Sequence, residues 1–435
     1  MIRYLQTVAL NTLPAKWLRI PSIKSGDTAA QSLPKKLIID VSSIAHLDAK
    51  TGIQRVVRNL YQQLLLAPPV GFQIVPVMAT RRKFYQAVPV NFLQEPSPAV
   101  TDATPIQIHV GDIFLGLDLS AHIIPHHLPA LCDWKKQGLR MTFVIYDLLP
   151  VLQPQWFNDR VSKNFKKWLN ALAILADNTV AISRSVQSDF DVWMHDVCRL
   201  GETDLPCAAM QLGAELNTDD GTTTDALGFL PAKLASQKFI LMVGTLEPRK
   251  GHADVIDAFE TLWGKCEQID LVIVGKQGWK VEQLIERLHS HSEAGKRLHW
   301  LNNANDDVLR SLYQGCKGVI VASKGEGFGL PLIEAAYFNK PVLARDIPVF
   351  REISGSNVSF FNGMESNDLV ELLSGWLRNL DAESSAVNNT SWISWRESCW
   401  QLNQLLRQFY DYEKDPVDMV FDDNQTETAL SKGQV

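Results

Sequence analysis

Short, wholly apolar segments alternate along this chain with longer segments whose apolar residues recur at helical spacing. The wholly apolar type is clearest at 239–244, and 140–146 is strongly apolar apart from Arg140 and Thr142. The helical spacing is clearest at 161–175 and 253–263. Strands that are apolar at every position must be covered on both faces of a sheet, and the helices between them can provide that cover. This alternation constrains the fold more than any other feature, and it predicts an α/β fold built on parallel sheets.

The alternation stops once and then restarts. Residues 217–225 are polar and lack periodicity, and a chain of 435 residues is too long for one ordinary domain. We therefore predict two Rossmann-like domains, at 36–225 and 226–394, that face a central cleft, because open parallel sheets bind ligands at the carboxyl ends of their strands. Three further segments are expected: an N-terminal arm at 1–35, a helix at 395–412 that can dock back on the first domain, and an acidic disordered tail at 413–435.

Individual elements follow from the same patterns. The predicted strands of the first domain lie at 36–41, 73–78, 106–110, 140–146 and 178–182. Those of the second domain lie at 239–244, 271–275, 298–301, 319–322, 341–344 and 358–361. The predicted helices include 53–66, 161–175, 253–263 and 395–410.

Composition excludes several classes of protein. The net charge of −6 argues against a nucleic-acid partner, and no apolar run reaches the roughly 18 residues that a membrane span needs. The six cysteines are scattered without a Cys-x-x-Cys pair, which indicates reduced thiols in a cytoplasmic protein rather than metal ligands. The basic arm at 1–35 is interpreted either as a surface segment packed on the first domain or as a weak contact with an anionic membrane.

A glycine-rich loop at 323–334 has the form of an anion site. A predicted strand precedes it, a helix follows it, and Pro331 falls in the first turn of that helix, where a missing N–H costs nothing. Free backbone N–H groups and the positive end of the helix dipole attract negative charge at such a place. Glu326 and Glu334 frame the loop, and because carboxylates repel phosphate they are better suited to hold hydroxyl groups. The loop therefore favours a nucleotide sugar, with hydroxyls on both its ribose and its sugar.

Two adjacent cations follow strand 239–244. Arg249 and Lys250 lie in the loop at its carboxyl end, on the same rim of the sheet as the loop at 323–334. An arginine and a lysine at this position can stabilise negative charge that builds on a leaving diphosphate. The alternative is a solvated pair of cations before a helix, which is disfavoured because cations near a helix N-terminus are electrostatically unfavourable.

Three segments, taken in this order and spacing, resemble the donor-binding domain of the family-4 retaining glycosyltransferases, which have the GT-B fold. They are 243–251 (Val-Gly-Thr-Leu-Glu-Pro-Arg-Lys-Gly), 271–276 (Leu-Val-Ile-Val-Gly-Lys) and 326–334 (Glu-Gly-Phe-Gly-Leu-Pro-Leu-Ile-Glu). The two glutamates of the last segment, separated by seven residues, are a specific signature of that family. The likeness covers residues 239–352.

The resemblance implies a role for each matching residue. Arg249 and Lys250 would contact the donor diphosphate, Glu326 would bind hydroxyls of the transferred sugar, and Glu334 would bind the ribose. Further donor contacts are implied at Gly244, Thr245, Gly275 and Asn302, and at the backbone of Phe328, Gly329 and Leu330. Enzymes of this family are typically metal-independent, so the resemblance implies no metal and no cofactor besides the nucleotide-sugar substrate.

The first half of the chain matches the family through a glycine that precedes a helix. Gly52 lies in Thr51-Gly-Ile-Gln-Arg-Val-Val-Arg58, where the family often has two glycines that make room for the diphosphate and the acceptor. Gly52 is therefore expected at the donor site. Arg55 and Arg58, on the helix that follows, are expected to face either an acceptor phosphate or solvent.

Two other polar residues follow predicted strands of the first domain. Asp147 comes after strand 140–146 and is expected to act in catalysis by orienting the acceptor or a donor sugar hydroxyl, or else to cap a helix. Its neighbour Tyr146 stands where many relatives carry histidine. Ser183 follows strand 178–182 and is interpreted either as a hydroxyl facing the cleft or as a helix cap.

The leading hypothesis is a retaining, metal-independent glycosyltransferase that moves a hexose from a nucleoside-diphosphate sugar to a hydroxyl of a growing glycan or lipid-linked saccharide. The resemblance extends to bacterial mannosyl- and rhamnosyltransferases that build O-antigen, capsule or exopolysaccharide. It implies work in the cytoplasm, at the inner face of the cell membrane, beside other polysaccharide-assembly enzymes. The alternatives are a sugar-nucleotide epimerase, a phosphorylase of the same fold, and a catalytically silent partner subunit.

Overall fold

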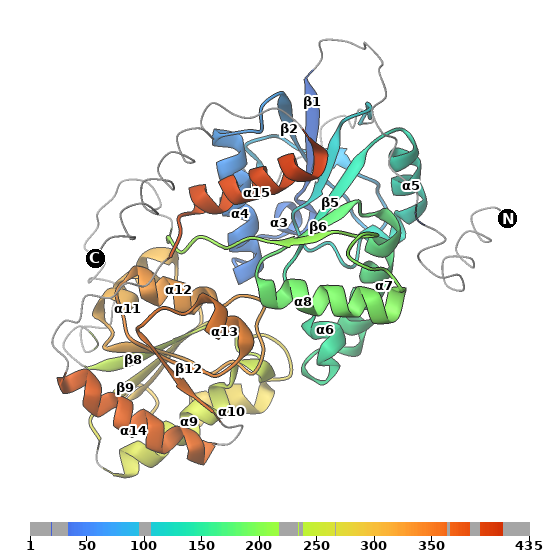
Figure 1. The fold of residues 1–435 in the computed structure, drawn as a ribbon. Helices are drawn as coiled ribbons and strands as arrows, with labels where there is room; N and C mark the ends of the chain where they lie inside the picture. Colours follow the sequence, from blue (N-terminus) through green and yellow to red (C-terminus); the bar gives the residue numbers. More distant parts are fainter. Residues whose placement is uncertain are drawn as a thin grey trace, which may run out of the picture.

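The computed structural model describes residues 34–94, 106–216, 238–265, 267–362, 366–382 and 392–411, together with Arg19 and Leu234. Most of the predicted arm, and all of the predicted linker at 217–225 and tail at 413–435, lie outside the described residues. The described strands form two sheets, one in each half of the molecule shown in Figure 1.

The first sheet is parallel except at one edge. Its strands, in spatial order, are β3 (Gln86–Ala87), β2 (Phe72–Met78), β1 (Lys35–Asp40), β4 (Ile113–Gly116), β5 (Arg140–Ile145), β6 (Asn178–Ala181) and β7 (Cys207–Ala209). Only the short β3 runs antiparallel to its neighbour among these described strands. All residues of β4 and β6 are buried, as the continuous apolar segments of a doubly covered sheet require.

Helices connect these strands. They are α3 (Ser42–His46), α4 (Gly52–Leu66), α5 (Leu128–Lys136), α6 (Leu149–Leu152), α7 (Asp159–Leu175) and α8 (Arg184–Trp193), with shorter turns at η1 (Phe92–Gln94), η2 (Ile124–His126), η3 (Pro154–Trp156) and η4 (Met194–Cys198). A capping box between Thr51 and Gln54 begins α4, because each side chain accepts the other's backbone N–H. Phe165, Leu169 and Leu172 form the buried face of α7, as their helical spacing predicts.

The second sheet is parallel throughout. Its strands, in spatial order, are β10 (Leu298–Leu301), β9 (Asp270–Val274), β8 (Phe239–Val243), β11 (Gly318–Val321), β12 (Val342–Arg345) and β13 (Val358–Phe361). Its helices are α9 (His252–Gly264), α10 (Glu282–Ser290), α11 (Asp306–Gly315), α12 (Leu330–Tyr337), α13 (Pro348–Ile353) and α14 (Ser366–Ala382), with a short turn at η7 (Pro248–Lys250). Two parallel sheets covered by helices confirm the predicted α/β fold.

Each sheet reverses its strand order at one point. The chain moves from β1 to β2 on one side and returns to β4 on the other, and it does the same around β8, with β9 on one side and β11 on the other. A crevice forms beyond the carboxyl ends of the strands at such a point. The loops that follow β8 and β11 contain the segments 244–251 and 322–329, so the topology places the two predicted donor loops side by side.

The predicted strand at 106–110 is wrong. Apolar residues alternate there with Gln107 and His109, yet these residues form a loop and a turn, and β4 comes after them. The carboxylate of Asp112 accepts hydrogen bonds from the N–H groups of Lys36 (2.8 Å) and His109 (2.9 Å). This side chain ties the loop to β1 and takes the place of strand pairing.

The last described helix returns to the first sheet. α15 (Trp395–Tyr410) packs on α4 and reaches β6, and it is the red helix in the upper half of Figure 1. The backbone N–H of Trp395 donates to a carboxylate oxygen of Glu215 (2.7 Å), and its indole N–H donates to the Glu215 carbonyl (2.9 Å). At the other end of α15, the hydroxyl of Tyr410 lies 2.7 Å from that of Thr142 on β5. The end of the described chain thus packs with its beginning.

Three residues of the predicted arm are described: Pro34 and Lys35, at the start of β1, and Arg19, which lies against the first domain. The guanidinium of Arg19 donates to the carbonyl oxygens of Ala173 (3.2 Å) and Ala176 (2.9 Å), at the C-terminal end of α7. A cation is favourable there because the last carbonyl groups of a helix carry partial negative charge.

Candidate functional site

The loops that follow β8 and β11 are in direct contact. The N–H of Lys324 donates to the carbonyl oxygen of Arg249 (2.7 Å), and Arg249 and Lys250 lie in a short turn that ends at Gly251. Gly251 has a φ of +74°, and a Cβ added to it would lie 2.4 Å from the carbonyl oxygen of Ala322. A glycine is therefore required for the two loops to come this close.

Arg249 and Lys250 both bind the carboxylate of Glu326. Nη1 of Arg249 donates to Oε2 (2.8 Å), Nζ of Lys250 pairs with Oε1, and the hydroxyl of Ser323 also donates to Oε1 (2.7 Å). Burial raises the pKa of Glu326, but Lys250 and Arg249 together outweigh that effect and lower the pKa to about 2. Glu326 is therefore ionised at neutral pH, within a cluster of two cations and one anion.

A second carboxylate, Glu247, holds Arg249 from the other side. Nε of Arg249 donates to Oε2 of Glu247 (2.8 Å), and Nη1 also donates to the carbonyl oxygen of Gly325 (2.9 Å). Glu247 is buried, which raises its pKa, while Arg249 and Lys250 act in the opposite direction. The guanidinium is thus fixed between two carboxylates, one before it and one far after it in the sequence.

Asp147 lies at the carboxyl end of β5, where the first domain meets this cluster. Its Oδ1 accepts from the N–H of Leu149 (3.1 Å), the first residue of the short α6, but the N-cap of that helix is Leu148 and not Asp147. Burial raises the pKa of Asp147 to about 6, although Arg249 opposes the increase. A Cβ added to Gly327 would lie 1.8 Å from the Tyr146 carbonyl oxygen and 3.1 Å from Cβ of Asp147. The loop that carries Glu326 therefore lies against Asp147.

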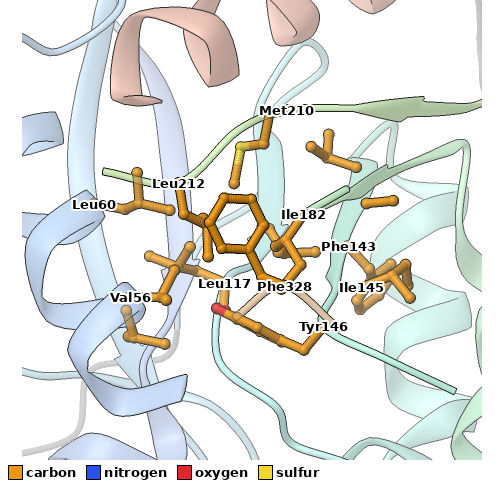
Figure 2. Packing of buried hydrophobic residues seen from close by; sticks show 14 of the residues in the cluster. Val56, Leu60, Leu117, Phe143, Ile145, Tyr146, Ile182, Met210, Leu212 and Phe328 are labelled. Carbon is orange, nitrogen blue, oxygen red and sulfur yellow. The ribbon is translucent and has the colours of Figure 1, made fainter. Parts of the chain in front are cut away.

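The side chain of Phe328 is buried in the first domain. Figure 2 shows it among residues of that domain, including Tyr146 and Ile182, although the loop that carries it belongs to the second domain. The residue before Phe328 makes a polar contact with the first domain: the hydroxyl of Ser183 donates to the carbonyl oxygen of Gly327 (2.8 Å). Ser183 also accepts from the N–H of Val186 (3.1 Å), so it is a buried helix cap that contacts the second domain. The side chain of Phe328 therefore joins the two domains.

Glu334 lies on α12 and is shared between the two domains. Nη1 of Arg55, on α4, donates to its Oε1 (2.5 Å), and the hydroxyl of Tyr313, on α11, donates to its Oε2 (2.7 Å). Nη2 of Arg55 donates to Asp306 (2.7 Å). Arg55 does not face solvent, as one of its two expected environments required, because it binds carboxylates of the second domain. Arg58 pairs instead with Asp48 of its own domain.

The remaining predicted donor residues surround these groups. Gly52 lies near α12, since a Cβ added to it would lie 3.6 Å from Cδ1 of Leu330. A Cβ on Gly275 would lie only 1.9 Å from the carbonyl oxygen of Gly244, so the loops that follow β8 and β9 also touch. Thr245 is part of this contact, since its backbone N would lie 3.2 Å from the same Cβ. Asn302 is exposed, in the turn after β10.

Gly329 precedes α12 with a φ of +116°, a value that glycine adopts most readily. Pro331 then falls in the first turn of α12, as its position in the sequence predicts.

Three residues of this site carried no role in the sequence analysis. Glu247 stands two residues before Arg249, and a carboxylate beside an arginine at the end of a strand is a signal that could have been noticed. Asp306 and Tyr313 carried no such signal, because only the folded chain places them beside Arg55 and Glu334.

Two features are absent from the part of the chain that the structure describes. It contains no group of three His, Cys, Asp or Glu side chains arranged to hold a metal ion. Nor does it contain a helix both long and apolar enough to cross a membrane.

Sequence comparison links the second domain to a known family. Residues 230–391 match the family model of glycosyl transferases group 1. The chain is 36% identical over 371 residues to a serotype-specific mannosyltransferase WbdA of Escherichia coli, which covers 84% of this chain but 45% of that protein. It is also 32% identical over 130 residues to the O-antigen chain mannosyltransferase B of Escherichia coli, covering 28% of this chain and 32% of that protein. The chain thus spans about half the length, or less, of these curated relatives.

Solved structures agree with the fold. The structure of Anabaena HepE with UDP and glucose aligns with a TM-score of 0.56 at 17% identity, covering 92% of this chain and all of that one. Sucrose-phosphate synthase from Thermosynechococcus elongatus aligns with a TM-score of 0.60 at 16% identity, covering 87% of this chain and 99% of that one. With its two sheets covered by helices, the chain has the GT-B fold of these structures, and residues 230–391 match the group 1 glycosyltransferase domain.

Proposed function

We propose that this protein transfers mannose from a nucleoside-diphosphate sugar to a hydroxyl of a growing O-antigen saccharide. The observation that carries the proposal is the cluster of Arg249, Lys250 and Glu326 at the carboxyl ends of β8 and β11, with Asp147 beside it. Its similarity to mannosyltransferases favours mannose over rhamnose. The acceptor is a lipid-linked saccharide, so the enzyme works at the inner face of the cell membrane.

The chemistry follows from the charges in this cluster. Arg249 and Lys250 take the negative charge that develops on the departing diphosphate, because ionic donors that are already fixed stabilise charge without reorganisation. In doing so they exchange part of their contact with Glu326 for contact with phosphate. Glu326, ionised and anchored by Ser323, then accepts hydrogen bonds from hydroxyls of the transferred sugar. These side chains supply the positive charge themselves, which supports a reaction without a metal ion.

The transfer retains the configuration of the sugar. The acceptor oxygen bonds to the anomeric carbon on the face from which the diphosphate leaves, and the acceptor proton passes to an oxygen of the departing diphosphate. No carboxylate is needed as a nucleophile in such a step. Asp147 accepts a hydrogen bond from a reacting hydroxyl and so fixes its direction.

A donor screen tests this function directly. We expect sugar transfer to a saccharide acceptor when a mannose donor is supplied from a set of GDP-, UDP- and dTDP-linked sugars. Mass spectrometry of the products, with and without acceptor, distinguishes transfer from epimerisation, which would release sugar and nucleotide without any acceptor. NMR of the new linkage reports its configuration. Binding of none of these donors would contradict the proposal, and an inverted linkage would contradict retention.

Asp147 is expected to make transfer dependent on pH. Its pKa is raised to about 6, so below that pH the carboxyl is protonated and, without its negative charge, accepts a hydrogen bond from a hydroxyl much more weakly. We expect kcat/KM to fall roughly tenfold for each pH unit below about 6. The variant Asp147→Asn should have a low kcat/KM that no longer changes across this range. A wild-type profile that stays flat from pH 7 to pH 5 would contradict the role of this carboxyl.

Unfolding at this group cannot explain that loss. Because the pKa of Asp147 is higher in the folded protein than the usual value near 4 of an unfolded chain, the folded state binds the proton first. The contribution of Asp147 to the free energy of unfolding therefore increases as the pH falls from about 6 to about 4. Thermal unfolding measured over the same range would show stability and activity changing in opposite directions at this group.

A further inference from the structure

Arg55 reaches out of the first domain to bind two carboxylates of the second. It lies in the first turns of α4, while its two partners, Glu334 and Asp306, lie on α12 and α11. Both contacts are short, at 2.5 Å and 2.7 Å, and the side chain of Glu334 is only 3% exposed. The guanidinium of Arg55 thus links the three helices α4, α11 and α12.

This position is costly for a cation unless it is paired. The N-terminal end of a helix carries partial positive charge, so Arg55 in the first turns of α4 is disfavoured by its own helix. Its burial adds to that cost. Glu334 and Asp306 offset both unfavourable effects, because each forms a charge-assisted hydrogen bond with a different nitrogen of the Arg55 guanidinium. The contact is therefore specific to arginine.

The same two carboxylates would harm donor binding if they were left unpaired. Gly52, which begins α4, lies against Leu330, which begins α12, so the ion pairs stand beside the loop where the diphosphate is proposed to bind. Glu326 is already neutralised by Arg249 and Lys250 within the second domain. Among the described ion pairs, Glu334 and Asp306 receive their cation from the first domain. Without Arg55, a diphosphate would meet two uncompensated negative charges.

We propose that Arg55 is a positioning residue for the nucleotide-sugar donor. It neutralises Asp306 and orients Glu334 for the ribose, so that the donor site is electrostatically complete only when the first domain lies against the second. This inference rests on the proposed function, because it takes a nucleoside-diphosphate sugar as the ligand. It adds to that function a residue of the first domain and a reason why donor binding and domain closure are coupled.

Calorimetric titration of the variant Arg55→Met tests the inference. The ligands are the nucleoside monophosphate and diphosphate of the base that the donor screen selects. Removing the cation should weaken binding of the diphosphate on the order of tenfold, and that of the monophosphate less, because repulsion grows with the charge of the ligand. Arg58→Met is the matched control: Arg58 lies on the same helix but pairs with Asp48 of its own domain. Its affinities should stay close to those of the wild type.

A double variant distinguishes electrostatics from a simple clasp between the domains. In Arg55→Met with Asp306→Asn, one of the two unpaired carboxylates is gone, so we expect several-fold recovery of diphosphate affinity relative to Arg55→Met. A clasp that only held the domains together would show no recovery, since neither contact is restored. Circular dichroism and thermal unfolding confirm that each variant is folded, and Arg55→Gln, which also removes the charge but keeps a polar side chain, serves if Arg55→Met is not.

The outcomes separate this inference from the proposed function. If the wild type binds none of the nucleoside diphosphates, the proposed function fails. If the wild type binds one and Arg55→Met binds it equally well, the function stands and the role of Arg55 is overturned. Equal losses for monophosphate and diphosphate, with no recovery in the double variant, also overturn it.

Discussion

Replacing Arg249 with alanine is expected to slow sugar transfer by a factor on the order of 10²–10³. Its guanidinium is fixed between Glu247 and Glu326 at 2.8 Å from each, so it is already aimed before a donor arrives. Lys250 would remain, but an ammonium is a point charge and cannot replace a planar fork. Steady-state kinetics with the selected donor should show the loss mainly in kcat, because the charge on the leaving diphosphate develops in the transition state.

A matched control keeps this result interpretable. Arg351 lies on α13, is more than half exposed, and pairs with Asp346, which belongs to neither donor loop. Arg351→Ala should transfer sugar at close to the wild-type rate. Near-native turnover by a folded Arg249→Ala variant would remove Arg249 from the catalytic cluster.

Changing Glu326 to glutamine is expected to separate donor binding from turnover. The carboxylate is ionised because Lys250 and Arg249 lower its pKa to about 2, against the effect of burial. In the glutamine variant, Lys250 and Arg249 would lose this negatively charged partner. A diphosphate should then bind at least as tightly as in the wild type. The sugar hydroxyls, however, would lose a charged acceptor, and we expect kcat to fall by roughly 10². Titration with the nucleoside diphosphate and steady-state kinetics measure the two effects.

The control for this variant is Glu371→Gln, because Glu371 is an exposed residue of α14. It should leave both quantities unchanged. A Glu326→Gln variant with wild-type kcat would contradict the role of the carboxylate in holding the sugar. If Arg249→Ala and Glu326→Gln were both close to wild type, the cluster would not be the catalytic site.

Continuous apolar segments made most of the fold predictable. Strands β5 and β8 lie where their sequences predict them, because a strand that is apolar at most or all of its positions is stable only between two layers of helices. The prediction failed at 106–110, where an apolar residue at every second position indicated a strand. There the carboxylate of Asp112 binds backbone N–H groups that would be paired in a strand. The alternation of apolar and polar residues at 106–110 gives no indication of this contact.

The site was predictable where its parts are neighbours in sequence. Arg249 and Lys250 stand together after a strand, and Glu326 and Glu334 share one segment, so local pattern was enough to identify them. The pairing of Arg55 with Glu334 joins residues 279 positions apart, and it depends on how two domains pack. For Phe328 the sequence indicated a backbone contact with the donor, but not that its side chain would be buried in the other domain.

The return of α15 to the first sheet determines where the second domain can be exchanged between related proteins. Gly213 pairs with Ile393, and Trp395 binds Glu215, so both connections leave the first domain at the same place. A fragment that ended at residue 216 would lack α15, which buries Leu402 and Leu406. Recombination that replaced everything after residue 216 would therefore pack the relative's α15 against the original core of the first domain. A clean exchange of donor specificity between relatives needs two junctions, one near 216 and one near 392.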